Sequence, residues 1–328
     1  MLVNPILTIR NSLLRVSGKN ALFERRGFFI KNSKVRSHLE NIGFQFLHGY
    51  HSALTSSVQD FTRHLNTDDQ YKGFCFEGAA MAKALTDWLS VKTHRELETL
   101  IADPIGDKHL YMVHVGVGWA YARLPVNIEQ KIERFDPTLR WLIIDGYGFH
   151  QGYFKTPKYV EKKELPAGLK QAHSRKVFYQ GLGRSLWFVD CATPKRIANR
   201  ISGFPLQFQS DLWSGVGLAC TYAGGVEASE IMELKTLSNC YFDHLAQGSV
   251  FAAKARQRAE LITPENELAC QIICGLTIKE AALIADKCLE ELSPSLSSEE
   301  RYSYWRKSIR DTFAKKAEYE NISSAIPA

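Results

Sequence analysis

Ionisable side chains stand inside apolar stretches of this chain, where burying a charge costs free energy. Glu77 lies in the apolar stretch 74–89, and both Asp145 and His150 lie in 141–154. A buried carboxylate must be paired or have its pKa raised, and enzymes often build acid–base sites in this way. We therefore take these three residues as candidate catalytic groups. The alternative is that each one hydrogen-bonds a neighbouring helix.

Aromatic rings and further polar side chains concentrate between residues 111 and 222. This mixture suits a pocket for an apolar or conjugated ligand, and it also suits an ordinary helical core. The candidate ligand-binding residues are His114, Trp119, Arg123, Tyr147, Arg184, Trp187, Asp190, Asp211, Trp213 and Tyr222. Arg25 and Arg26 follow Glu24, so they are candidates either for binding an anionic group or for an ion pair.

No motif in the sequence indicates a cofactor or a metal, and we expect neither. The segment 141–152 runs into Gly146-Tyr147-Gly148, but its glycine spacing differs from that of a dinucleotide-binding fold. The seven cysteines lack zinc-ligand spacing, and we expect buried free thiols in a reducing cytoplasm. The net charge of +6 comes with no nucleic-acid-binding module, and no apolar run has membrane-spanning length. The expected partner is a hydrophobic small-molecule intermediate or a biosynthetic enzyme, and the oligomeric state is open.

A repeat organises these residues. A glycine followed two positions later by a small residue recurs at Gly78, Gly116, Gly146, Gly181, Gly215 and Gly248, in steps of 38, 30, 35, 34 and 33 residues, with Gly49 as a possible seventh instance. A period of about 34 residues is typical of stacked helical hairpins. The sequence therefore predicts an all-α fold with six or seven hairpins, arranged as an open solenoid or a closed α/α toroid. The glycines are expected to let helices approach closely.

Polar residues precede most of these glycines, at Glu77, Asp145, Gln180, Ser214 and Gln247, with His48 before the possible seventh. The apolar spacing predicts continuous helices over 34–64, 229–259 and 265–292. We divide the chain into an N-terminal segment 1–33, a helical-hairpin repeat domain 34–292, and a C-terminal capping helix with its tail, 293–328.

Several strings resemble a known family. They are ERRGF (24–28), FEGAAMAKAL (76–85), HVGVGWAYARL (114–124), DGYGFHQGYF (145–154), GLGRSLWFVD (181–190) and DLWSGVGLACTYAGG (211–225). Over residues 22–310 the chain is similar to the UnbL-type domain of unknown function that accompanies enediyne polyketide synthases. The resemblance implies a bacterial, cytoplasmic protein of secondary-metabolite biosynthesis, and it assigns no catalytic role to any residue.

Two functions follow as hypotheses. The first is a cofactor-independent tailoring enzyme, an isomerase or cyclase, that acts on a hydrophobic polyene or polyketide intermediate through acid–base groups. The alternative is a non-catalytic scaffold or binding protein for pathway enzymes, because helical-repeat arrays often present an extended surface to a partner.

Overall fold

The computed structural model describes residues 14–90 and 95–325, with side chains described up to residue 314. Every regular element in this part of the chain is a helix, so the predicted all-α class is confirmed. The long helices are α3 Ser33–Thr55, α5 Lys72–Leu89, α8 Leu110–Tyr121, α10 Trp141–Phe154, α11 Ala172–Val189, α13 Leu206–Ala223, α15 Phe242–Arg258, α17 Ile278–Glu290 and α18 Ser298–Ala325. The shorter ones are η1 Gly18–Ala21, α2 Phe23–Arg26, α4 Val58–His64, η2 Asp69–Tyr71, α6 Glu96–Ala102, α7 Pro104–Lys108, α9 Ile128–Lys131, η3 Ile132–Arg134, η4 Pro157–Glu161, α12 Pro194–Ser202, α14 Ala228–Ser238, η5 Asn239–Tyr241 and α16 Pro264–Cys274.

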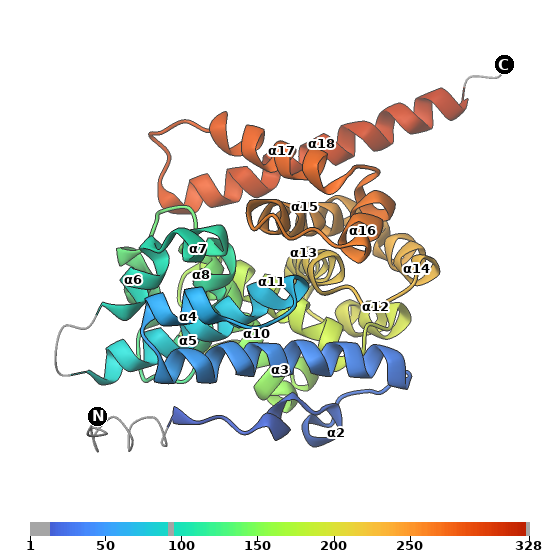
Figure 1. The fold of residues 1–328 in the computed structure, drawn as a ribbon. Coiled ribbons are helices and arrows are strands. Elements are labelled where there is room, and N and C mark those ends of the chain that lie inside the picture. The colour runs from blue at the N-terminus through green and yellow to red at the C-terminus, as the bar shows by residue number, and fades with distance from the viewer. Residues whose placement is uncertain (1–13, 91–94, 326–328) are drawn as a thin grey trace, which may run out of the picture.

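The long helices pack in chain order. Helix α3 packs on α5, and the series continues through α8, α10, α11, α13 and α15 to α17. In Figure 1, α3 lies along one side of the body, whereas α15, α17 and α18 lie on the opposite side. Shorter helices occupy most of the connections between them, so each long helix contacts its predecessor and its successor.

Glycines make these contacts close. An added Cβ at the first glycine of a repeat would overlap a backbone carbonyl of the preceding long helix, for the pairs Gly116 with Glu77, Gly146 with Val115, Gly181 with Asp145, Gly215 with Gln180 and Gly248 with Ser214. The second glycine meets the following helix in the same way, for the pairs Gly118 with Ile143, Gly148 with Phe178, Gly183 with Leu212 and Gly217 with Leu245. The predicted packing role of the glycines is confirmed.

Gly49 takes part in the same kind of contact, because a Cβ there would overlap the backbone of Cys75 on α5. The apolar residues 141–144, which look like a strand before a glycine loop, form the first turn of α10 instead. Gly146 and Gly148 are in mid-helix, where neighbouring backbones cover them. A phosphate loop therefore has no place at this position.

Three predicted continuous helices are each divided in two, because local capping interrupts them. Ser57 accepts a hydrogen bond from the backbone N–H of Asp60 and begins α4 inside 34–64. Asn239, at φ 43°, separates α14 from the 3₁₀ turn before α15. Gly275 ends α16 in the left-handed region at φ 64°, a conformation that favours glycine. Apolar periodicity continues across such breaks, so periodicity alone misses them.

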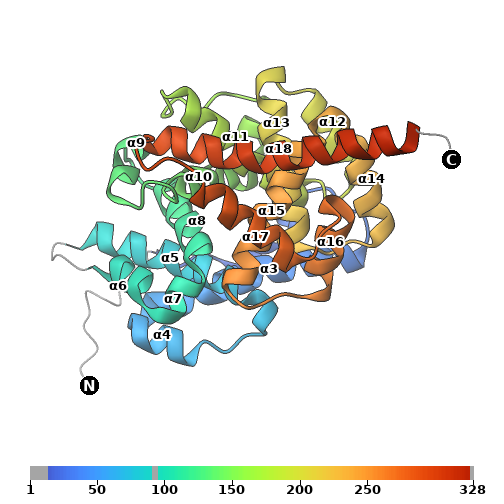
Figure 2. The same cartoon turned by 90° about the horizontal axis from the view of Figure 1, so that it is seen from above.

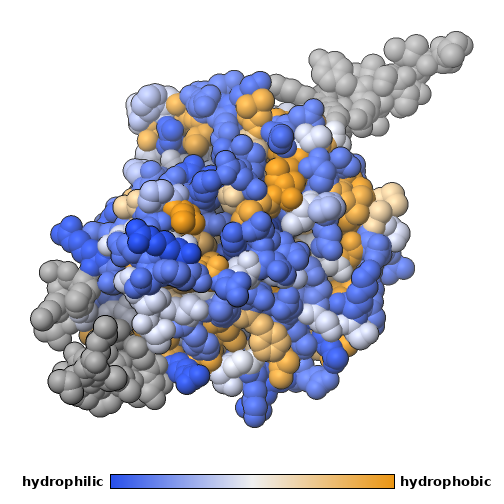
Figure 3. All heavy atoms as spheres, viewed as in Figure 1, coloured by the Kyte–Doolittle hydropathy of each residue, from blue (hydrophilic) through white to orange (hydrophobic). Residues whose placement is uncertain are grey.

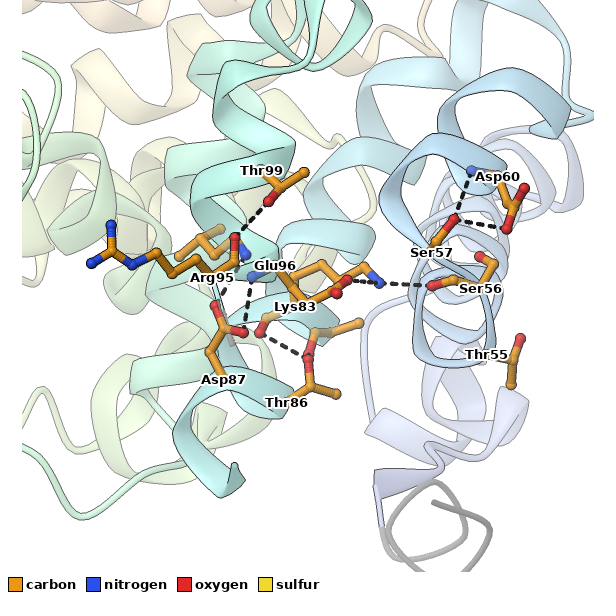
Figure 4. Close-up of polar contacts among 12 residues, drawn as sticks. Thr55, Ser56, Ser57, Asp60, Lys83, Thr86, Asp87, Arg95, Glu96 and Thr99 are labelled. Carbon is orange, nitrogen blue, oxygen red and sulfur yellow. Dashed lines mark hydrogen bonds and ion pairs between the residues drawn. The ribbon is translucent and has the colours of Figure 1, made fainter. Parts of the chain in front are cut away.

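Polar contacts hold the outer helix α6 to α5. The buried Lys83 side chain donates hydrogen bonds to Glu96 Oε2 and to the Ser56 carbonyl, each at 2.8 Å. The Asp87 carboxylate accepts from the backbone N–H groups of Glu96 and Leu97 at 3.1 and 3.0 Å (Figure 4). Satisfying these helix N-terminal donors fixes where α6 begins.

Helix α18 lies across α15 and α17 and passes over the central helices (Figure 2). Its inner face buries Tyr302, Trp305, Ile309 and Phe313. The Trp305 indole N–H donates to the Ala285 carbonyl at 2.7 Å. The C-terminal helix therefore covers part of the core that the preceding helices leave open.

On the face seen in Figure 3, hydrophilic residues predominate and apolar residues form separate small patches. Within residues 14–90 and 95–325, no single helix is long and apolar enough to cross a membrane. Helices α16 and α17 reach that length and composition only when they are taken together, and the chain bends by 62° between them.

The close helix contacts predict a stability effect. We expect Gly148→Ala to lower the free energy of unfolding by about 1–3 kcal/mol, because the new Cβ would overlap the Phe178 carbonyl and push α10 from α11. Gly168→Ala is the matched control, since an added Cβ there meets nothing within 4 Å. Urea unfolding measures both variants, and equal stability of the two would contradict the packing role.

Candidate functional site

A cavity of about 570 Å³ lies between α3, α5, α8, α10, α11, α13 and the segment before α2. This volume falls in the range of small-molecule sites, which is about 300–1,000 Å³. Its wall is mostly apolar and aromatic, and the rings include Phe46, Phe74, Trp119, Phe149, Tyr153, Phe188 and Tyr222. The Trp119 ring contacts the rings of Phe46 and Phe149, with centroids 4.4 and 5.2 Å apart. The wall can therefore enclose a flat or elongated apolar molecule.

The repeat positions the cavity-lining side chains. The residue that follows the second glycine lines the cavity in four successive long helices: Trp119 after Gly118, Phe149 after Gly148, Arg184 after Gly183 and Leu218 after Gly217. Because each glycine holds its helix at a fixed distance from the next, equivalent residues of successive helices point into one space. This position is a sequence signal that locates the cavity, and our sequence analysis did not use it.

Glu77 of α5 is the only acidic residue among the described cavity-lining residues. Its side chain is almost fully buried, with 3% of its surface exposed. Burial raises the pKa of Glu77 to about 7, and the Arg184 guanidinium partly offsets this rise. The Trp119 indole also lowers the pKa of Glu77, although its Nε1 has no acceptor in good hydrogen-bonding geometry among the residues that the structure describes. Near neutral pH this carboxyl group can therefore both accept and release a proton.

Arg184 lies between two carboxylates. Its Nη1 forms an ion pair with the fully buried Asp145, and its guanidinium stacks over the Phe149 ring at 5.1 Å. Gln180 Nε2 donates to the other oxygen of Asp145 at 2.8 Å. Asp145 does not line the large cavity, whereas Arg184 does. Asp145 thus holds Arg184 in place from behind the cavity wall.

The polar residues that precede the glycines form a buried row. Gln180 donates to the Tyr302 hydroxyl at 3.3 Å, and Ser214 donates to Gln247 at 2.8 Å. Arg306 of α18 donates to Gln247 at 3.1 Å and to Asp211 at 2.9 Å. Helix-to-helix hydrogen bonds therefore engage Asp145, Gln180, Ser214 and Gln247, as is usual for buried polar groups, although Gln180 Oε1 and Gln247 Nε2 have no partner among the described residues. Glu77 holds the same position in its repeat but faces the cavity.

His150 lines the cavity and packs its ring against Phe154 and Trp119, with centroid separations of 4.7 and 5.5 Å. Burial lowers the pKa of His150 to about 3, and the nearby charges of Arg123, Lys155 and Arg26 add to this effect. The imidazole is therefore neutral at physiological pH. Its Nδ1 is buried without a hydrogen-bond partner among the described residues, which leaves it available to a ligand.

The predicted ligand-binding residues fall into two groups. Trp119, Arg123, Arg184 and Tyr222 line the large cavity. His114 lies at a second cavity of about 500 Å³, and its Nδ1 lies 2.9 Å from the Leu110 carbonyl. The remaining five do not line the large cavity. Two of them are carboxylates in ion pairs: Asp190 pairs with Arg196 and Arg200, and Asp211 pairs with Arg306. The other three are aromatic: Trp187 donates to the Gly224 carbonyl, Trp213 is buried, and Tyr147 packs against Phe178.

Neither of the two arginines predicted to bind an anion lines the large cavity. Arg25 is exposed at the end of α2. Arg26 donates to the Tyr153 carbonyl at 2.8 Å and lies over the Phe154 ring at 4.7 Å. The sequence analysis also missed two basic residues that do line the cavity, Arg15 and Lys155. Arg15 lies in the N-terminal segment and Lys155 directly follows the apolar stretch 141–154, so neither one stands inside the stretches from which the candidates were taken.

The second cavity carries charges of both signs, including Asp87, Arg95, Arg134 and Asp136. Arg134 donates to the Tyr121 hydroxyl at 3.2 Å and stacks over Phe135. Asp87 caps α6, as described above. Arg95 pairs with Glu98, and Asp136 accepts hydrogen bonds from the backbone N–H groups of Thr138 and Leu139. Most polar groups of the second cavity therefore have structural roles, so we place the candidate site at the large cavity.

Across its described residues the chain is all-helical, and the lining of its aromatic cavity holds one carboxyl group, Glu77, and three guanidinium groups, those of Arg15, Arg123 and Arg184. Residues 6–313 match the family described as a protein of unknown function, DUF1702, and the chain belongs to this family. Comparisons with curated proteins and with solved structures found no match.

Proposed function

We propose that this protein is a cofactor-independent enzyme that binds an elongated apolar molecule in the large cavity and uses Glu77 as its acid–base group. The observation that carries the proposal is a buried carboxyl group, with its pKa raised to about 7, on an aromatic cavity wall. A general acid or base works best when its pKa lies near the operating pH. Burial against rings supplies that pKa here.

An isomerisation fits these groups. The Glu77 carboxylate removes a proton from a carbon next to a carbonyl or polyene system, and the resulting carboxylic acid returns the proton to another carbon. A double bond moves, and no atom is gained or lost. The Arg184 guanidinium lies beside Glu77 and carries the positive charge that stabilises an oxyanion formed in between. A cyclisation with the same proton transfers is the related alternative.

The setting of this reaction is part of the proposal. We infer that the substrate is a polyene or polyketide intermediate of bacterial secondary metabolism, in a cytoplasmic pathway of the enediyne type. The sequence strings that resemble the UnbL-type domain support this setting. The aromatic cavity wall supports a conjugated substrate, because aromatic rings pack well on flat apolar molecules.

We also propose that the long helices descend from repeated helical hairpins. Equivalent glycines of successive helices meet equivalent backbone positions, which supports duplication of one unit. In this interpretation, the cavity formed between the residues that follow the second glycine of successive units. Glu77 acquired a catalytic role at the position before the first glycine, where the other units carry residues that hydrogen-bond neighbouring helices.

Metabolite profiling tests the proposal directly. A strain that lacks the gene should accumulate an apolar intermediate, and the purified protein should convert that intermediate with no added cofactor. If the protein is a scaffold, the deletion strain should also lose the final product of the pathway, but the purified protein should leave the accumulated intermediate unchanged. That outcome would overturn the catalytic proposal.

A further inference from the structure

The rim of the large cavity is basic, although its interior is apolar. Arg15, Arg123 and Lys155 line the cavity and have exposed side chains. Glu77, the only carboxylate among the described cavity-lining residues, is buried inside. The cavity therefore has two chemically different ends, a cationic opening and an aromatic interior.

The rim charges come from separate parts of the fold. Arg123 follows the end of α8, Lys155 is the C-cap of α10, and Arg15 precedes η1. Arg123 and Lys155 line the same cavity as His150, and their charges add to the burial that lowers the pKa of this imidazole. Arg123 also acts on the Tyr50 hydroxyl, which donates to the carbonyl of Leu14, the residue next to Arg15.

Helix dipoles explain only part of this arrangement. A basic residue at a helix C-terminus offsets the partial negative charge there, and this applies to Lys155 and Arg123. Arg15, in the segment before η1, belongs to neither of these two helices. Converging cations at the mouth of an apolar cavity are the chemistry that recognises an amphipathic anion, because guanidinium and ammonium groups form charge-assisted hydrogen bonds with carboxylate and phosphate oxygens.

We infer that the ligand of this cavity carries an anionic end group, a carboxylate or a phosphate, which Arg15, Arg123 and Lys155 hold at the rim while the apolar body extends inward toward Glu77. The opposite orientation would bring a second negative charge to the buried Glu77, and the interior guanidinium of Arg184 is already paired with Asp145, so burial of the anion there would be costly. This inference rests on ligand binding in the cavity, as proposed above, and does not depend on Glu77 being catalytic.

A fluorescent polyene tests the orientation. cis-Parinaric acid is a conjugated fatty acid whose emission rises in apolar sites, and its methyl ester is the uncharged counterpart. We expect the full-length protein to bind the acid more tightly than the ester. The variant Arg123→Gln/Lys155→Gln should lose affinity for the acid about tenfold or more, and its affinity for the ester should stay within about twofold.

The matched control is Arg63→Gln/Lys279→Gln, which removes two exposed cations that do not line the cavity. Both double variants change the net charge equally, so a non-specific charge effect would weaken the two alike. Competition with hexadecanoate, hexadecyl phosphate and hexadecanol then identifies the end group, since the anion that displaces the probe most strongly names the chemistry.

The outcomes separate this inference from the proposed function. Equal binding of acid and ester, or equal weakening by the two double variants, would overturn the anionic end group and leave an apolar ligand site intact. Binding of neither probe would overturn both proposals. Tight binding of the acid that depends on Arg123 and Lys155 would support the inference even if Glu77→Gln retained full turnover.

Discussion

Glu77→Gln should reduce turnover of the apolar substrate about 10²–10⁴-fold, which is the usual contribution of a positioned general acid or base. Glutamine keeps the shape of the side chain and cannot exchange a proton with the substrate. The wild-type pH–rate profile should show an inflection near pH 7, the pKa to which burial raises Glu77, and the variant should lack it. Steady-state kinetics on the purified intermediate measure both effects.

The same substitution should stabilise the protein at high pH. The pKa of Glu77 rises on folding from 4.5 to about 7, so below pH 4.5 both states are protonated and the carboxyl group has no effect on stability. Between pH 4.5 and 7 the unfolded chain releases the proton while the folded chain retains it, and the wild type loses stability. Above pH 7 the loss is complete and amounts to about 3 kcal/mol, which Glu77→Gln should restore.

Glu290→Gln is the control for these measurements, because Glu290 is exposed on α17 and does not line the cavity. It should change neither the turnover nor the pH dependence of stability. Wild-type turnover in Glu77→Gln would remove the acid–base role. Equal stability of the variant and the wild type at pH 8 would show that folding does not raise the pKa of Glu77.

Asp145→Ala should destabilise the protein by about 3–5 kcal/mol, the cost of leaving one partner of a buried ion pair unpaired. Asp145 is fully buried, pairs with Arg184 and accepts a hydrogen bond from Gln180. The variant leaves the guanidinium of Arg184 without its counter-charge and the Gln180 amide without an acceptor. Urea unfolding at pH 7 measures the loss, and any loss of product in cells should follow the loss of folded protein.

Two further variants separate a structural role from a catalytic one. Asp145→Leu/Arg184→Met removes both charges, and it should recover most of the lost stability because a buried ion pair can often be replaced by apolar groups. Asp311→Ala breaks the exposed pair with Lys307 on α18 and should cost at most about 0.5 kcal/mol. A stable Asp145→Ala protein with no turnover would contradict our assignment and return Asp145 to the catalytic candidates.

The glycine spacing carried most of what could be predicted about the fold. It predicted helices, and it predicted that Gly148 and its equivalents lie where helices touch. A glycine inside a helix lowers the stability of that helix, so its recurrence indicates that a neighbouring helix must approach closely. The helix ends at Ser57 and Gly275 were not predicted. Each end depends on one side chain or one backbone angle, whereas apolar periodicity is read over many residues and continues across the break.

The candidate site was predicted in part. Trp119, Arg184 and Tyr222 were predicted from the sequence as ligand-binding residues, and they line the cavity. Trp187 and Asp211 were predicted on the same grounds, and they do not line it. In a chain of buried helices, aromatic and polar residues occur on every face. Which face turns toward an open space depends on the rotation of each helix against its neighbours, and the aromatic or polar character of a residue does not indicate that rotation, whereas its position relative to the second glycine does.

By itself, the sequence determined the helical class and the close contacts of the helices, because propensity and the need for small residues act locally. It also marked the row of buried polar residues that precede the glycines. Only the tertiary structure distinguished Glu77 from Asp145, which hold equivalent positions in that row. Asp145 meets an arginine and a glutamine from α11, whereas Glu77 faces an aromatic cavity beside the same arginine. The pKa of a buried carboxyl group is set by what surrounds it in space, so the same position of the repeat holds an ion-paired carboxylate at Asp145 and a carboxyl group with a raised pKa at Glu77.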